Sequence, residues 1–215
     1  KFKKYYIIKF IHMKNKKIRI GIAGLGTVGS GVVNLLDKNK EEIFRRTGFE
    51  IEIAAISATD KTKQRDCDIT GFKFYSNPLD LIDSEQIDII VELIGGDKVA
   101  KELVLKSIKK NIHVVTANKA LIALHGNEIS EISEKNQCDV AFEASVAGAV
   151  PIIKVIRESL SANKIFWIAG IINGTTNFIL TKMLQTKKNF DDVLEEAKKL
   201  GYAEADPAFD IGGID

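Results

Sequence analysis

Apolar residues alternate with polar residues or glycine from Ile18 to Ile22, and a glycine-rich turn follows at Gly24–Gly29. This alternation is typical of a β-strand. Apolar residues then recur at helical spacing from Val28 to Ile43. The pattern therefore predicts a strand, a glycine turn and a helix in close succession.

Strands and helices continue to alternate as far as residue 144. Strands are predicted at 50–57, 87–94, 113–116 and 139–144, and helices at 98–110 and 120–135. The run 87–94 is apolar almost throughout, as expected for a strand buried on both faces of a parallel sheet. The alternation indicates an α/β fold with an open parallel sheet.

The rhythm changes after Gly148. A helix is predicted at 149–160, with Pro151 near its start, where proline is tolerated. A strand at 165–172 and helices at 176–185 and 191–200 follow. The last helix has acidic residues in its first turn, lysines in its last turn, and Gly201 as its stop. We place a domain junction near residue 146.

Residues 1–15 form a basic and aromatic extension that we expect to be poorly ordered. Its apolar pieces are short and interrupted by lysine, unlike a signal peptide. A segment that lies on a membrane surface is the alternative for this extension. Met13 is a candidate for the native start. Residues 16–145 then make up the first domain, and residues 146–215 begin a second one.

The composition narrows the possible functions. The chain has 215 residues, of which 45% are hydrophobic, and a net charge of +2. This balance gives no broad basic surface for nucleic acid or a membrane, and no apolar run is long enough to span a bilayer. Cys67 and Cys138 lie far apart without a metal or redox motif, so we expect reduced thiols in a cytoplasmic protein.

The glycine turn is the first candidate site. A G-x-G-x-x-G motif between a strand and an amphipathic helix is typical of dinucleotide binding. Gly24 permits the tight turn, Gly26 lets a pyrophosphate approach the backbone, and Gly29 lets the helix pack on the strand. The amino terminus of the helix then faces the phosphates.

The sequence leaves the choice of cofactor open. A site that prefers NAD usually has an acidic residue at the end of the second strand, whereas this strand runs into Thr59, with Asp60 only afterwards. The basic residues Lys61, Lys63 and Arg65 follow. They form either a solvated loop or a site for a 2′-phosphate. We therefore favour NADP and keep NAD open.

Two further stretches carry candidate chemistry. Lys119 follows the strand 113–116, at the sheet edge where ligands of such folds bind. It is suited to a substrate carboxylate or a carbonyl oxygen, and the alternative is an exposed lysine. The second stretch is acidic and rich in Gly and Pro, which indicates a shaped loop of a site. Its carboxylates are Glu204, Asp206, Asp210 and Asp215.

Several long blocks of sequence together resemble homoserine dehydrogenase. They read GIAGLGTVGSGV, VELIGG, VVTANKALIA, FEASVAGAVPII, GIINGTTNFIL and KLGYAEADPAFDIGGID. The resemblance implies a Rossmann-type domain joined to an α/β substrate and dimerisation domain. It also implies a cytoplasmic homodimer that reversibly reduces L-aspartate 4-semialdehyde to L-homoserine with NADPH or NADH. This step belongs to threonine, methionine and isoleucine biosynthesis.

The resemblance also implies roles for individual residues. Besides the three glycines, the cofactor contacts would be Thr27, Val28, Thr116, Lys119, Gly201 and Glu204. The substrate contacts would be Tyr202, Glu204, Asp210 and Asp215, and the catalytic residues would be Lys119, Glu204 and Asp215. Backbone oxygens would bind a sodium ion at Glu143, Val146, Gly148 and Val150. A plain domain hinge is the alternative for this last segment.

This sequence departs from the family pattern in two respects. Thr59 stands where the family often has arginine, which leaves the cofactor open. The family's proton-donating lysine would lie four residues beyond Asp215. We therefore expect an incomplete substrate domain, weak NADP(H) binding and negligible turnover of homoserine by this chain.

Two other functions compete with this one. A nucleotide-binding module without catalysis is the first. Another Rossmann dehydrogenase is the second, but a phosphorylating aldehyde dehydrogenase needs a nucleophilic cysteine in a polar loop. Cys138 precedes a predicted strand, and Cys67 has no histidine near it in the sequence.

Overall fold

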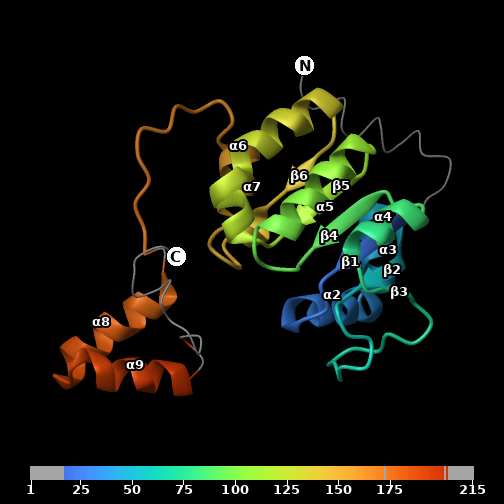
Figure 1. Cartoon of the computed structure of the whole chain (residues 1–215). Helices are drawn as coiled ribbons and strands as arrows, with labels where there is room; N and C mark the ends of the chain where they lie inside the picture. The colour runs from blue at the N-terminus through green and yellow to red at the C-terminus, as the bar shows by residue number, and fades with distance from the viewer. Residues whose placement is uncertain (1–16, 172, 201, 203–215) are drawn as a thin grey trace. The chain divides into compact units, whose positions relative to one another are not determined.

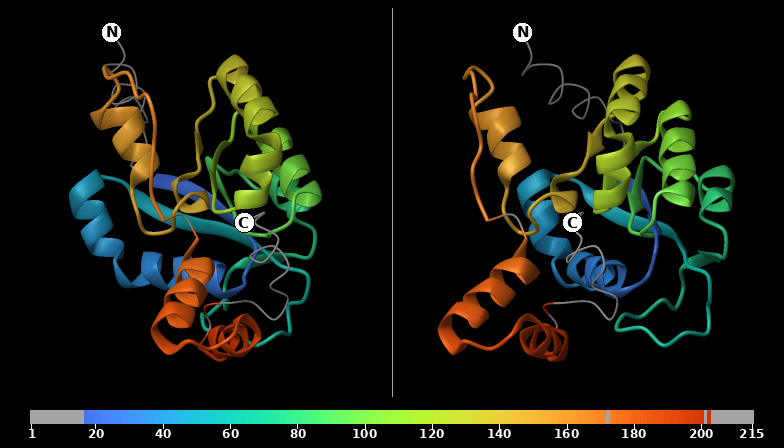
Figure 2. Two further views of the ribbon diagram at one scale, coloured as in Figure 1. Left: turned by 90° about the vertical axis from the view of Figure 1, so that its left-hand side faces the viewer. Right: turned by 60° about the vertical axis from the view of Figure 1, so that its left-hand side comes forward.

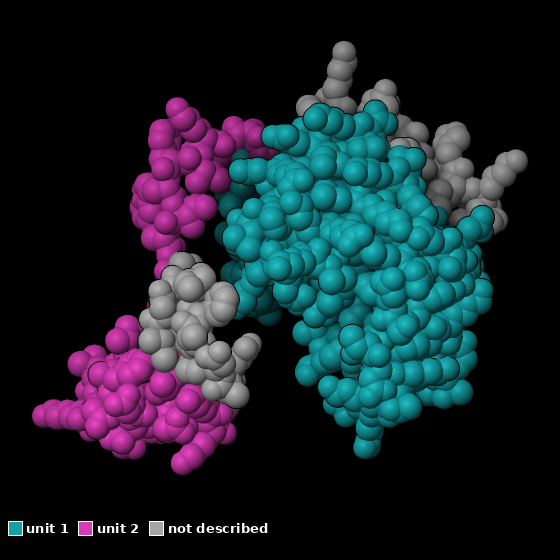
Figure 3. All heavy atoms as spheres, in the orientation of Figure 1, with its two compact units in different colours: residues 1–160 teal, residues 161–215 magenta. Residues whose placement is uncertain are grey.

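The computed structural model describes residues 17–171, 173–200 and 202. The chain divides into two compact units, residues 1–160 and residues 161–215, which Figure 3 shows in teal and magenta. The predicted extension over residues 1–15 lies outside the described residues.

The first unit is built on a six-stranded sheet in which every neighbouring pair of strands is parallel (Figure 1). The strand order is β3-β2-β1-β4-β5-β6. This is the order of the doubly wound dinucleotide-binding fold, so the predicted fold class is confirmed. The strands are β1 Lys17–Ala23, β2 Glu50–Ser57, β3 Lys73–Tyr75, β4 Ile89–Glu92, β5 His113–Thr116 and β6 Val140–Ala141.

Helices cover both faces of this sheet. Successive strand residues point to opposite faces, so neighbouring residues of one strand pack into different cores. Ile56 and Val91 pack with Val33 of α2, whereas Ala55 and Ile90 pack in a second core with α4, α5 and α6. Figures 1 and 2 show α5 and α6 side by side. The helices are α2 Thr27–Lys38, α3 Lys40–Thr47, α4 Pro78–Ser84, α5 Lys98–Lys109 and α6 Lys119–Asn136.

The structure refines several predicted elements. The predicted strands 50–57 and 113–116 coincide with β2 and β5, whereas 139–144 shrinks to β6 and a 3₁₀ turn at Glu143–Ser145. The helix predicted from Val28 to Ile43 is two helices, because the backbone leaves the helical region at Asn39. β3 and α4 were not predicted from the sequence. The signal for α4 in the sequence was Asn77 followed by Pro78, a common start of a helix. In the structure the Asn77 side chain caps this helix by accepting the Leu79 N–H.

The unit ends in a short helical stretch that agrees with the helix predicted at 149–160. It consists of α7 Ile152–Lys154 and a π-helical turn at Val155–Ser159. The strand predicted at 165–172 is wrong for residues 165–171, which have no regular structure. Phe166 and Trp167 of this stretch are about four-fifths exposed, at 82% and 78%. Apolar β-branched and aromatic residues favour a strand only when a neighbouring strand pairs with them, and no described strand does so here.

The second unit contains the two helices predicted at 176–185 and 191–200, and these pack against each other as a hairpin. It consists of α8 Gly174–Thr186 and α9 Phe190–Lys199. The side chains of Asn173 and Asn189 cap the two helices by accepting backbone N–H groups at 2.6 and 2.9 Å. Their shared core is small and consists of Ile179, Val193, Leu194 and Ala197. None of the described helices of the chain is long and apolar enough to cross a membrane.

Candidate nucleotide site

The glycine turn begins where β1 ends. Gly24 has a φ of +102°, a conformation that side chains with a Cβ rarely adopt. Its N–H donates to Ser57 O of β2 at 2.8 Å, and a Cβ here would lie 2.3 Å from Leu93 O, next to β4. The turn is therefore held between the carboxyl ends of the two strands that flank β1.

The other two glycines of the motif differ in their surroundings. A Cβ at Gly29 would lie 2.0 Å from Gly24 O, so only glycine lets α2 approach the turn this closely. A Cβ at Gly26 would meet nothing within 4 Å, and Gly26 is exposed. The space beside Gly26 is therefore open to a ligand, which fits the close approach of a pyrophosphate.

The amino terminus of α2 is suited to an anion. Gly26 is its N-cap and makes no side-chain capping bond, and the first turn has no acidic residue. The first bond into the helix runs from Ser30 N–H to Gly26 O at 2.9 Å, which leaves the N–H groups of Thr27 and Val28 at the exposed end. Unpaired N–H groups and the helix dipole together favour a phosphate there.

The sheet topology places this turn at the usual ligand edge. The chain leaves β1 towards β2 and β3 on one side and towards β4, β5 and β6 on the other. Ligands of such sheets bind outside the carboxyl ends of the strands where the order reverses. The strand ends at Ser57, Glu92 and Thr116 border that edge together with the turn.

The loop after β2 is held by hydrogen bonds among some of its own polar groups. The Thr62 hydroxyl and N–H both donate to Asp60 Oδ1 at 2.7 Å, which holds the pKa of the Asp60 carboxyl below its usual value. The Arg65 guanidinium donates to Lys63 O at 2.7 Å and to Asp60 O. Arg65 therefore shapes this loop, although the sequence offered it as a candidate for a 2′-phosphate.

The two lysines of the same loop remain exposed. Lys61 Nζ lies 5.8 Å from the centre of the Phe74 ring of β3, so its ammonium group is near the end of that strand. Lys63 contributes its backbone oxygen to Arg65, and its side chain is in solvent. These two side chains are the remaining candidates of the loop for an anionic ligand group.

The carboxyl ends of β4 and β5 are joined through a buried carboxylate. Glu92 Oε1 accepts the Ile94 N–H at 2.8 Å, and Glu92 Oε2 accepts the Thr116 hydroxyl at 2.6 Å. Glu92 is 0% exposed. Thr116 was a candidate from the sequence, whereas Glu92 was not, although an acidic residue inside the apolar run 87–94 was a signal for it.

Asn118 joins the loops that follow the same two strands. Its side-chain oxygen caps α6 by accepting the Leu121 N–H at 3.0 Å, and its amide nitrogen donates to Gly96 O at 2.5 Å. Lys119 is the first residue of α6 and is exposed at this edge. The structure thus brings Thr116 and Lys119 to the same sheet edge as the glycine turn.

The predicted sodium segment has an unusual backbone. Ala147 and Ala149 have φ values of 47° and 68°, which cost free energy for residues other than glycine. The Glu143 carboxylate accepts the N–H groups of Ile153 and Lys154, so this side chain caps the start of α7. No group of three or more His, Cys, Asp or Glu side chains suited to a metal occurs in the described part of the chain.

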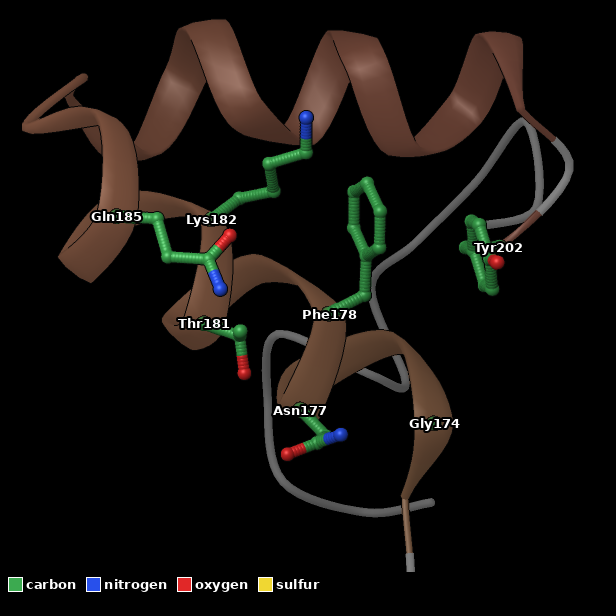
Figure 4. A pocket seen from close by; sticks show the side chains of 7 residues that line it. All are labelled: Gly174, Asn177, Phe178, Thr181, Lys182, Gln185 and Tyr202. Carbon is green, nitrogen blue, oxygen red and sulfur yellow. The ribbon is translucent and has the colours of Figure 1, made fainter.

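Tyr202 is the one predicted substrate contact that the described residues include. Its ring stacks on Phe178 with a centroid separation of 4.5 Å (Figure 4). The two rings border a shallow pocket of about 370 Å³ in the second unit. The pocket is also lined by Gly174, Asn177, Thr181, Lys182 and Gln185. Gly201, Glu204, Asp210 and Asp215 lie outside the described residues.

Two family models match the chain in succession. Residues 24–143 match the model described as homoserine dehydrogenase, NAD binding domain, and residues 151–215 match the model described as homoserine dehydrogenase. The interval between them contains residue 146, where the sequence pattern predicts a domain junction. That boundary stays a prediction.

Individual relatives agree with these matches. Homoserine dehydrogenase of Pseudomonas aeruginosa is 54% identical over 93% of this chain and 46% of its own length. The crystal structure of a homoserine dehydrogenase from Thiobacillus denitrificans is 52% identical with a TM-score of 0.86, over 92% of this chain and 46% of that one. A hyperthermophilic archaeal homoserine dehydrogenase in complex with NADPH is 32% identical with a TM-score of 0.80, over 92% and 66%. The chain spans about half the length of the curated relatives it matches.

Proposed function

The chain belongs to the homoserine dehydrogenase family, and on this premise we propose that the protein reversibly reduces L-aspartate 4-semialdehyde to L-homoserine with a nicotinamide cofactor. The succession of the two family matches, with the glycine turn at the start of the first, is the observation that carries the proposal. The exposed amino terminus of α2 beside the open space at Gly26 supports the binding of the cofactor's pyrophosphate.

In the proposed reaction the cofactor supplies the hydride, and the protein supplies binding, orientation and a proton. Thr27, Val28 and Thr116 would contact the cofactor along the sheet edge described above. The ammonium group of Lys119 would stabilise negative charge on the reacting oxygen. The alkoxide that forms on hydride addition then takes a proton from an acid nearby.

The substrate side of the proposal rests on the acidic segment. A substrate ammonium group calls for carboxylates, which Glu204 and Asp215 supply, with Asp210 in support. Gly201 and Tyr202 would lie close to the same ligand. These roles come from the family resemblance and are proposals for residues 201–215.

Homoserine-dependent reduction of NADP⁺ tests this function in the protein at the full length of its curated relatives. We expect Glu204→Ala to lower kcat/KM by about 100-fold, because the substrate ammonium loses a charged partner. The matched control is Glu195→Ala in α9, which removes an exposed carboxylate paired with Lys198 at 3.0 Å. The control should keep its activity.

Two results would count against this assignment. Unchanged kcat/KM in Glu204→Ala would remove that residue from the site. Tight NADPH binding without any turnover of homoserine in the full-length protein would favour a nucleotide-binding module without catalysis.

We further propose that the cofactor is NADP rather than NAD. The exposed ammonium groups of Lys61 and Lys63 follow β2, whose end carries the ribose contact in such folds. We expect Lys63→Glu to weaken NADPH binding about tenfold relative to NADH, since it replaces an attraction for the 2′-phosphate by a repulsion. Fluorescence titration with both cofactors measures the ratio.

The control for this experiment is Lys135→Glu, which makes the same charge change in the last turn of α6. This turn is at the far end of the helix from the sheet's carboxyl edge. The ratio should remain that of the unsubstituted chain. An unchanged ratio in both Lys61→Glu and Lys63→Glu would contradict the assignment of the 2′-phosphate to this loop.

Three further properties belong to the proposal. Backbone oxygens of Glu143, Val146, Gly148 and Val150 would bind a sodium ion, which the positive φ values at Ala147 and Ala149 support, because strained backbone is frequent at ligand sites. The full-length protein would be a homodimer. It would act in the cytoplasm.

A further inference from the structure

Glu92 is a buried carboxylate for which the proposed reaction has no use. It is the last residue of β4, and its two oxygens accept hydrogen bonds from the Ile94 N–H and the Thr116 hydroxyl. Burying an ionisable group costs free energy unless its hydrogen bonds are satisfied. A purely apolar residue would fit the rest of this strand, so the carboxylate calls for an explanation.

The direction of the hydrogen bonds makes Glu92 an acceptor. The Asn118 N–H donates to Thr116 Oγ1 at 3.0 Å, and this hydroxyl donates its single proton to Glu92 Oε2. A continuous chain of bonds therefore runs from the end of β4, through the end of β5, to the start of α6. A side chain at position 92 that also donates a hydrogen bond would disrupt this series of hydrogen bonds.

The same network fixes two loops against each other. The loop after β4 is held by Glu92 at Ile94 and by the Asn118 side chain at Gly96. The loop after β5 is held by the bond between Glu92 and Thr116 and by Ser145, whose hydroxyl donates to Thr116 O at 2.9 Å. Both loops border the ligand edge on the β4–β6 side of the sheet.

In a doubly wound sheet each half binds one mononucleotide, and the β1–β3 half takes the adenosine side. The loops after β4 and β5 therefore border the nicotinamide side. We propose that Glu92 is a positioning residue that holds these two loops in the shape that receives the nicotinamide half of the cofactor. This inference rests on the proposed function, because it needs a dinucleotide at this edge.

A comparison of whole and partial cofactor tests the inference in the 215-residue chain. NADPH is the whole cofactor, and 2′,5′-ADP carries only the adenosine side. We expect Glu92→Gln to weaken NADPH binding about tenfold and to change the dissociation constant of 2′,5′-ADP by less than about twofold. The glutamine keeps the size of the side chain, but its amide NH2 places a donor against one of the two donors that Glu92 accepts, the Ile94 N–H or the Thr116 hydroxyl.

The matched control is Glu85→Gln. Glu85 has a side chain that is only 5% exposed and accepts a hydrogen bond from Tyr75 at 2.7 Å, at the end of α4. Loss of this carboxylate should leave both dissociation constants near their original values. It therefore separates the position of Glu92 from the general effect of removing a buried carboxylate.

A double-mutant cycle with Thr116→Val gives a second measurement. Because the bond to Thr116 is how Glu92 holds the loop after β5, Glu92→Gln should add little to the loss of NADPH affinity in a Thr116→Val background. Additive losses would overturn the inference, as would a proportional loss of NADPH and 2′,5′-ADP binding in Glu92→Gln. If the protein at the full length of its curated relatives bound neither ligand, the nucleotide site would be refuted, and with it both the proposed function and this inference.

Discussion

Gly26→Ala is expected to leave the fold intact and to weaken NADPH binding by about 100-fold, or about 2.7 kcal/mol. The backbone of Gly26 has a φ of −79°, which alanine adopts readily, and the added Cβ would meet nothing within 4 Å. The same open space is where a pyrophosphate approaches the backbone. The methyl group therefore obstructs the ligand and not the protein.

Fluorescence titration of NADPH and thermal unfolding of the ligand-free chain measure the two effects. Gly31→Ala is the matched control, since Gly31 lies within α2 and a Cβ there also meets nothing within 4 Å. It should leave the affinity unchanged and stabilise the helix by about 1 kcal/mol, because alanine is the better helix former. Binding of NADPH by Gly26→Ala at the original affinity would refute the assignment of the pyrophosphate to this turn.

The fold could be predicted where the apolar pattern of a segment by itself marks it as a buried strand. The run 87–94 and the alternation from Ile18 to Ile22 both mark strands in the middle of the sheet. β3 could not be found this way, because three residues at a sheet edge carry no period. The strand predicted at 165–172 is wrong for residues 165–171 for the opposite reason. Its apolar pattern indicates a tendency to pair, but the partner strand is a property of the tertiary structure.

The site shows a similar division between local and tertiary information. The glycine turn could be predicted because its motif, strand and helix are contiguous. Glu92 escaped notice because its hydrogen-bond partner Thr116 is 24 residues away in sequence and becomes its neighbour only through the pairing of β4 with β5. Arg65 was offered as a ligand for phosphate, but its guanidinium binds carbonyl groups of its own loop. Charge at a position does not reveal where the side chain points.

Gly29→Ala is expected to destabilise the first unit by about 2 kcal/mol or more, although alanine favours a helix. The helix propensity contributes about 1 kcal/mol in favour of alanine. Against it, the new Cβ would lie 2.0 Å from Gly24 O, which is a backbone atom that no change of rotamer can move. Overpacking typically costs about 1–3 kcal/mol, occasionally more, and the cost here is at least about 3 kcal/mol because the clash also displaces a turn that is fixed by β2 and β4.

Thermal unfolding followed by circular dichroism measures the balance of these terms. A net loss of about 2 kcal/mol should lower the unfolding midpoint by roughly 4–8 °C in a domain of this size. Gly31→Ala, with the same chemical change half a turn further along α2, should raise the midpoint instead. If the two variants were equally stable, α2 would not pack against the turn as closely as the structure shows. Glycine at position 29 would then be needed only for ligand binding.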